Sequence, residues 1–108
     1  MTGEEFVRLC FEEKEAALRE YCSPASESAV SGLVRQLVSG GSDRETIHQL
    51  IDLVMTESWY TMLLALDGEA SLGGEQQTYR LYAEDDTLLN ECGELEAAAW
   101  EAFMEKDD

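Results

Sequence analysis

Basic residues are scarce in this sequence. Only 7 lysines and arginines stand against 24 aspartates and glutamates, which gives the 108-residue chain a formal charge of −17. The phosphates of nucleic acids and of anionic lipids would repel such a protein. We therefore expect no direct nucleic-acid partner and no membrane partner.

Residues for metal and nucleophile chemistry are scarce as well. His48 is the single histidine, which removes most zinc sites and catalytic triads. The three cysteines, Cys10, Cys22 and Cys92, lack the spacing of a zinc site, and their odd number does not fit a complete disulfide framework. Carboxylates are so abundant that no pair stands out as an acid/base dyad. We expect a cytoplasmic protein that is not an enzyme and holds no metal or cofactor.

Three helices are expected in the first 66 residues. A capping box at 2–5 and a 3.6-residue apolar period predict the first helix, up to about residue 21. Ser23 followed by proline predicts the start of the second helix, which Gly40-Gly41 ends. A second capping box at 42–45 predicts the third.

The second and third helices carry apolar stripes that should face the core. These stripes are Ala29, Val30, Leu33, Val34, Leu37 and Val38 in the second helix, and Ile47, Leu50, Ile51, Val54, Met55, Met62 and Leu66 in the third. A straight helix up to residue 66 would be roughly 36 Å long, which favours a bend or break near Ser58-Trp59.

The pattern changes after Asp67-Gly68. Residues 76–83 alternate with a period of two, a polar turn follows, and 87–89 resembles a short return strand, so we expect a β-hairpin. A last helix is expected at about 94–104. The predicted fold is a single α+β domain of three N-terminal helices packed with a β-hairpin and a C-terminal helix.

The negative charge is concentrated in the second part of the domain. The helical part at 1–66 carries 11 acidic and 5 basic side chains, whereas the acidic hairpin-plus-helix part at 67–108 carries 13 and 2. At 100° per residue, one stripe of the last helix contains Glu94, Glu101, Glu105 and Asp108, with Ala97 and Ala98 between them. Leu95, Ala99, Ala102 and Phe103 should face the core, and Trp100 and Met104 should lie at the boundary.

The acidic stripe has two interpretations. It is either a solvated face that keeps the protein soluble, or a binding edge for a basic protein. Anions near a helix C-terminus cost a few tenths of a kcal/mol each, and solubility alone would not require them there. We therefore predict a negative partner-binding surface, with arginines and lysines of the partner pairing with its carboxylates. Its predicted residues are Glu94, Glu101, Glu105, Trp100, Met104, Glu84, Asp85, Asp86, Asp67 and Glu69.

Several stretches of roughly the last 45 residues resemble a group of small acidic bacterial proteins. They are 63–74, 79–86 and 93–95, followed by Trp100. That group is associated with immunity proteins that neutralise polymorphic or contact-dependent toxins. The resemblance implies a cytosolic, non-enzymatic inhibitor held in a one-to-one complex with its toxin, and it implies no catalytic residue.

Three other functions remain open from the sequence. An enzyme that uses one isolated buried carboxylate is the weakest of them, because no sequence feature indicates which acid would serve. A nucleic-acid mimic that inhibits a nuclease or defence complex would need carboxylates spread along an elongated surface. A homo-oligomeric accessory or structural subunit would explain apolar stripes that exceed what one small core needs. The chain is accordingly expected to be a monomer or a homodimer.

Overall fold

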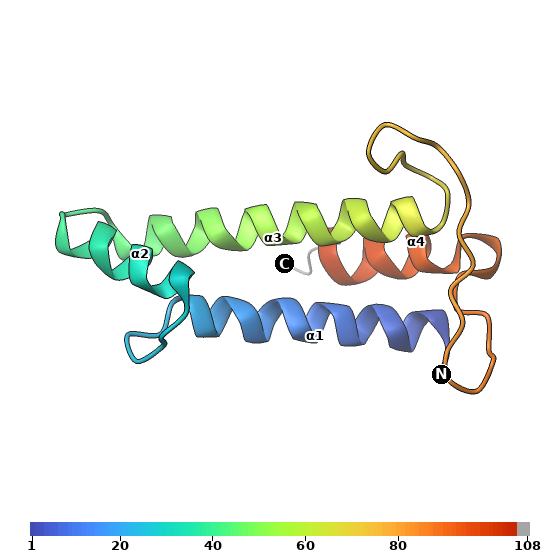
Figure 1. The fold of residues 1–108 in the computed structure, drawn as a ribbon, viewed down its shortest axis with the longest axis horizontal. Helices are drawn as coiled ribbons and strands as arrows, with labels where there is room; N and C mark the ends of the chain where they lie inside the picture. The colour runs from blue at the N-terminus through green and yellow to red at the C-terminus, as the bar shows by residue number, and fades with distance from the viewer. Residues whose placement is uncertain (106–108) are drawn as a thin grey trace.

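The computed structural model describes residues 1–105 as an arrangement of helices. The elements are α1 (Gly3–Tyr21), α2 (Ala29–Ser39), α3 (Arg44–Leu66), η1 (Glu91–Gly93), α4 (Glu94–Ala99) and η2 (Trp100–Met104), which continues α4. α1 and α3 lie side by side, α2 connects them at one end, and α4 packs against both at the other end (Figure 1). The protein is a single all-helical domain.

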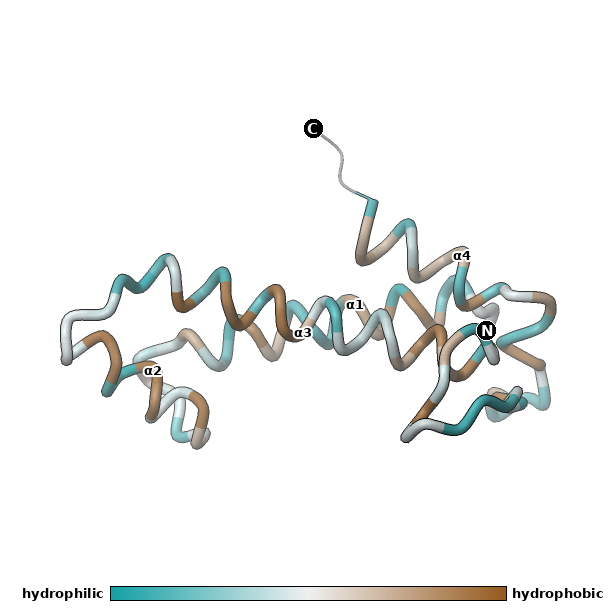
Figure 2. The backbone as a smooth tube through the Cα atoms, turned by 90° about the horizontal axis from the view of Figure 1, so that it is seen from above, coloured by the Kyte–Doolittle hydropathy of each residue, from teal (hydrophilic) through white to brown (hydrophobic). Residues whose placement is uncertain are grey.

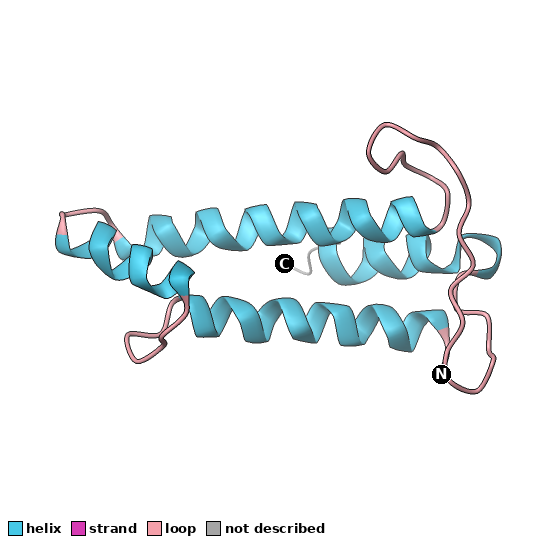
Figure 3. Cartoon of the chain, viewed as in Figure 1, coloured by secondary structure: helices cyan, strands magenta, loops and turns pink. Residues whose placement is uncertain are grey.

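The expected α+β class is wrong, because the β-hairpin does not form. Within residues 1–105 there is no strand (Figure 3), and the predicted hairpin is reduced to one isolated antiparallel bridge between Tyr82 and Leu88. The buried side chain of Asn90 explains why the pairing stops there. Its Oδ1 accepts from Leu81 N at 2.9 Å, and its Nδ2 donates to Tyr79 O at 2.6 Å. One side chain thus satisfies backbone groups that a strand ladder would otherwise pair.

Two of the three predicted helix starts are shifted. Thr2 caps α1 as expected, accepting from Glu5 N at 3.1 Å. α2 begins later than predicted, because Ser28 rather than Ser23 caps it by accepting from Ser31 N at 3.1 Å. α3 is capped by Asp43, the second residue of the predicted box, which accepts from Thr46 N at 3.1 Å.

α3 is continuous over its whole length. The helix runs for 23 residues without the expected interruption near Ser58-Trp59. It is accommodated because the molecule is elongated, with principal extents of 48 × 31 × 29 Å. Within residues 1–105, no helix has both the length and the apolar character needed to cross a bilayer.

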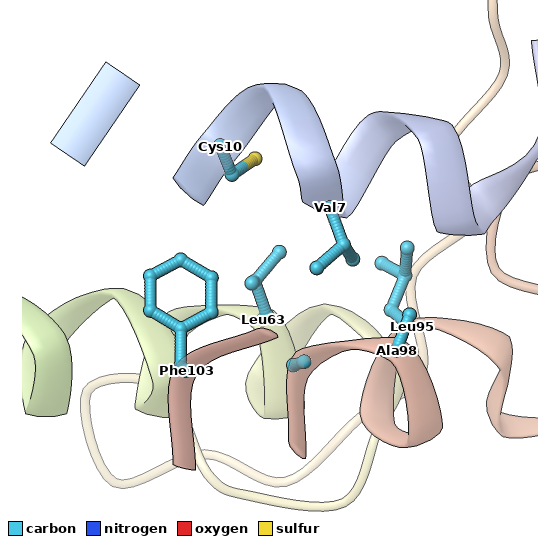
Figure 4. Close-up of a cluster of buried hydrophobic side chains, with 7 residues drawn as sticks. Val7, Cys10, Leu63, Leu95, Ala98 and Phe103 are labelled. Carbon is cyan, nitrogen blue, oxygen red and sulfur yellow. The ribbon is translucent and has the colours of Figure 1, made fainter. Parts of the chain in front are cut away.

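The main core lies where α1, α3 and α4 meet (Figure 4). Its fully or nearly fully buried members are Val7, Cys10, Leu63, Leu95, Ala98, Ala99 and Phe103. Phe11 packs edge-on against Phe103, with ring centroids 5.3 Å apart. The helix at 94–104 therefore forms as predicted and anchors the C-terminal half through its apolar face. Ala98 was expected between the acidic side chains and instead belongs to this core.

The stripe predicted for α3 is only partly buried. Ile47 is buried, but Leu50, Val54 and Met62 are exposed, while Leu63 packs in the core. α2 similarly buries Val34 and leaves Leu33 and Leu37 exposed. The end of the molecule that contains α2 is consequently less well covered than the end that contains α4.

Candidate functional site

Two of the predicted binding carboxylates hold the fold together. Asp67 is buried, and its Oδ2 accepts from Glu96 N at 2.8 Å in the first turn of α4. Gly93, which precedes α4, has no side chain to cap the helix, so Asp67 supplies the cap from the end of α3. Glu94 is half-buried and accepts from Gly3 N at 3.0 Å, which caps the start of α1. Neither carboxylate is freely available to a partner.

Burial raises the pKa of the Asp67 carboxyl above its ordinary value. The hydrogen bonds from the backbone of Glu96 and Leu95 act in the opposite direction, and the nearby charges of Glu69 and Glu94 add to the increase. Asp67 Oδ1 is buried without a hydrogen-bond partner among the described residues. The side chain therefore has a structural role at some electrostatic cost.

Trp100 lies in the exposed face of the α4–η2 helix. Its side chain is 52% exposed, and its ring meets Tyr60 of α3 edge-on at a centroid distance of 6.3 Å. Three acidic side chains surround it: Glu96, Glu101 and Glu105, which line the same depression of about 390 Å³ with Tyr60, Ala97 and Trp100. We call Tyr60, Glu96, Trp100, Glu101 and Glu105 the Trp100 surface.

The last turn of this helix is wider than an α-helical turn. Glu105 N donates to Trp100 O at 2.8 Å, a bond that spans five residues and defines a π-type turn. Such turns are rare and are frequent at functional sites. Glu105 follows this turn directly and lines the same depression as Trp100.

The carboxylates of the Trp100 surface lack internal counter-ions. Within residues 1–105, the side-chain ion pairs are those of Lys14 with Glu15 and Asp52, and none involves Glu96, Glu101 or Glu105. Lys14 is itself buried between α1 and α3, so its charge is used internally. No basic side chain lies in the last turn to offset the anions there. The surface is therefore negative, with an aromatic side chain at its centre.

The other predicted binding carboxylates lie elsewhere. In Figure 2, α4 leaves the layer of α1 and α3 on one side, and much of the connection between α3 and α4 lies on the other side. Glu69, Glu84, Asp85 and Asp86 are exposed on this connection. The structure thus does not join these carboxylates and the Trp100 surface into one continuous surface.

Two of these carboxylates border an apolar groove. Glu84 and Asp85 lie at its edge, and its floor includes Phe6 and Leu9 of α1 and Trp59 of α3, around a volume of about 790 Å³. Asp85 Oδ2 lies 3.7 Å from the amino terminus. Hydrogen bonds from Thr87 lower the pKa of the Asp85 carboxyl below its ordinary value.

Two residues of the Trp100 surface were not predicted from the sequence. Glu96 lies about 40° from Trp100 at 100° per residue. The helical projection could therefore have placed Glu96 on the same face as Trp100. No local pattern marks Tyr60 as part of this surface, because only the packing of α3 against η2 places it beside Trp100. Met104 is half-buried against the core, and Asp108 lies outside the described residues.

Comparison of the chain with family models, with curated proteins and with solved structures gives no match. A functional interpretation therefore depends on the geometry of the chain itself.

Proposed function

We propose that this protein is a non-enzymatic acidic binding protein that neutralises a basic partner protein through the Trp100 surface. The observation that carries the proposal is the exposed indole of Trp100 among three carboxylates that have no internal counter-ion within residues 1–105. Tryptophan is enriched among residues that dominate interface energetics, and carboxylates form strong bidentate pairs with arginine.

The two parts of the Trp100 surface have different tasks in this mechanism. Glu101 and Glu105 are exposed and attract a cationic surface over a distance of about 10 Å at moderate ionic strength. Trp100 then provides an apolar contact that excludes water from the ion pairs and strengthens them. Charge would mainly set the association rate, and burial of Trp100 would mainly set the lifetime of the complex.

The form of this function that we favour is an immunity protein that inhibits a bacterial toxin in the cytoplasm. The high negative charge supports a basic, nucleic-acid-handling partner, because such surfaces are themselves positive. The free cysteines Cys10, Cys22 and Cys92 are compatible with a reducing compartment.

The test begins with affinity capture by the tagged full-length chain from the cells that produce it. Two variants with the same change of charge are compared: Glu101→Lys with Glu105→Lys at the Trp100 surface, and Glu12→Lys with Glu27→Lys at exposed positions outside it. We expect a basic protein that binds the wild type and the control equally and binds the Trp100-surface variant at least roughly tenfold more weakly.

If the chain is an immunity protein, the captured protein must also be toxic. Produced alone, it should arrest growth, and production of the wild-type chain should relieve the arrest while the Trp100-surface variant should not. An acidic captured protein, or equal capture by both variants, would contradict the proposal.

A further inference from the structure

The apolar groove beside the connection between α3 and α4 is a second candidate binding site. It has a volume of about 790 Å³ and lies between α1, Trp59 of α3 and residues 81–85. Exposed apolar surface with a polar rim marks sites of interaction. We propose that this groove binds a basic amphipathic helix of another protein. The proposal does not depend on the Trp100 surface, which has different residues.

The wall that α1 contributes to the groove is a helical stripe that the described chain covers only in part. Its members are Phe6, Leu9, Cys10 and Glu13, which have the spacing i, i+3, i+4 and i+7. Leu9 is 45% exposed, and Tyr82 across the groove is 53% exposed. A helix that binds in a groove uses anchors of the same spacing. A facing helix could therefore pack its apolar side chains between those of α1.

The groove has carboxylates at both ends. Of the α1 residues that line it, Glu13 is the farthest from the amino terminus, roughly 10 Å along the helix axis from Phe6. Glu84 and Asp85 lie beside the start of α1, where the connection passes the amino terminus (Figure 1) and Asp85 Oδ2 is 3.7 Å from the terminal nitrogen. A helix with an apolar face between positively charged ends matches this arrangement.

Charge distinguishes a basic helix from other occupants. The described residues that line the groove include no lysine, arginine or histidine, and Arg8 and Arg80, which are adjacent in sequence, do not line it. Among residues 1–105, no ion pair involves Glu13 or Glu84. An acidic helix or an anionic lipid would be repelled, and a neutral helix would leave these carboxylates partly desolvated without a partner. Lysine or arginine side chains would pair with them.

The test uses the fluorescence of Trp59. The sequence has two tryptophans, so the full chain with Trp100→Phe reports on the groove alone. The probe is a tryptophan-free helical peptide of about 16 residues, with leucines at i, i+3, i+4 and i+7 and lysines at both ends. The matched peptide has glutamates in place of the lysines. We expect the lysine peptide to change the Trp59 emission saturably and the glutamate peptide to bind at least roughly tenfold more weakly.

Charge variants of the same protein test the carboxylates. Glu13→Lys with Glu84→Lys should raise the Kd of the lysine peptide at least roughly tenfold. The control, Glu27→Lys with Glu45→Lys, makes the same change of charge at exposed positions outside the groove. It should raise the Kd by less than about threefold, because distant exposed charges are screened.

An apolar variant tests the floor of the groove. Leu9→Gln should raise the Kd at least roughly tenfold, because the burial of a leucine side chain is lost. Leu72→Gln, at an exposed leucine outside the groove, should leave it unchanged. Circular dichroism checks that the variants keep their helices. If the charge variant loses them, Leu9→Gln carries the test, since Leu9 is exposed and outside the core.

Three results would overturn the proposal. The first is the absence of a saturable change in Trp59 emission up to about 1 mM lysine peptide. The second is equal binding of the two peptides, which would show that apolar contact alone selects the occupant. The third is equal binding by the folded groove variants and their controls.

Discussion

Three polar side chains connect segments that are distant in the sequence. Asp67 caps α4, Glu94 caps α1, and Asn90 binds the backbone of the connection and donates to Leu66 O at 2.9 Å. Each satisfies a backbone group that a helix end or a strand partner would otherwise leave unpaired. Local sequence patterns do not reveal such contacts, and for this reason Asp67 and Glu94 were predicted to bind a partner.

Removal of the Asp67 cap should destabilise the fold. Asp67→Ala deletes the acceptor for Glu96 N, and we expect a loss of about 1–2 kcal/mol in the free energy of unfolding at neutral pH. Urea denaturation measures this loss. Glu69→Ala is the control, because Glu69 is exposed and should change stability by less than about 0.5 kcal/mol. Equal stability of the two variants would contradict the structural role of Asp67.

Asp67 should also make stability depend on pH in a defined direction. Its pKa is raised in the folded state, so its contribution is complete below the unfolded pKa of about 3.9 and is lost as the pH rises through the folded pKa. Asp67→Asn keeps an acceptor oxygen and does not titrate. The stability of the wild type relative to Asp67→Asn should therefore fall as the pH increases from the acid range towards neutrality, as measured by urea denaturation. If this relative stability rose with pH instead, the raised pKa of Asp67 would be contradicted.

At the level of elements, the sequence predicts the helices well and the connection poorly. The Thr2 cap and the stop at Gly40 depend on contacts within one turn, which a local pattern contains. The helix at 94–104 follows from its apolar period, although its cap comes from Asp67. The alternation at 76–83 also indicates extended backbone. A strand needs a partner ladder, however, and here tertiary contacts of Asn90 replace it. The Trp100 surface was predicted in part, because Trp100, Glu101 and Glu105 share one helix.

The junction between α1 and α4 depends on a close approach at Gly3. A Cβ at this position would lie 2.1 Å from Leu89 O and 2.7 Å from the Glu94 side chain. We expect Gly3→Ala to destabilise the protein by about 1–3 kcal/mol through this overlap. Thermal and urea denaturation measure the effect.

Gly32 in α2 provides the matched control. The nearest side-chain atom to a Cβ there is Arg35 Nη2 at 4.0 Å, so alanine fits without overlap. Gly32→Ala should stabilise the protein by about 0.5–1 kcal/mol, because glycine is unfavourable within a helix. If Gly3→Ala lowers the free energy of unfolding while Gly32→Ala raises it, the close approach at Gly3 is supported. A stabilising Gly3→Ala would contradict it.

At the level of the whole molecule, excess negative charge dominates the electrostatics. The chain carries −17, and internal ion pairs of the described residues involve only Lys14 and the amino terminus as cations. We expect added sodium chloride to raise Tm by screening repulsion within the fold. Differential scanning calorimetry checks this. A fall in Tm with salt would indicate that attractive pairs outweigh the repulsion.

The elongated shape separates two kinds of surface on one small domain. The radius of gyration of 16.3 Å exceeds the roughly 13 Å of a compact chain of this length. Exposed apolar side chains lie at the α2 end, and the Trp100 surface lies on α3, α4 and η2.

The affinity for the captured basic partner, measured by titration calorimetry at increasing salt, tests the central proposal most directly. For the wild type and for Glu12→Lys with Glu27→Lys, we expect the same tight binding, which weakens steeply with salt. For Glu101→Lys with Glu105→Lys, we expect a Kd at least roughly tenfold higher and a much shallower salt dependence. Identical Kd values and salt dependences for all three proteins would contradict binding through the Trp100 surface.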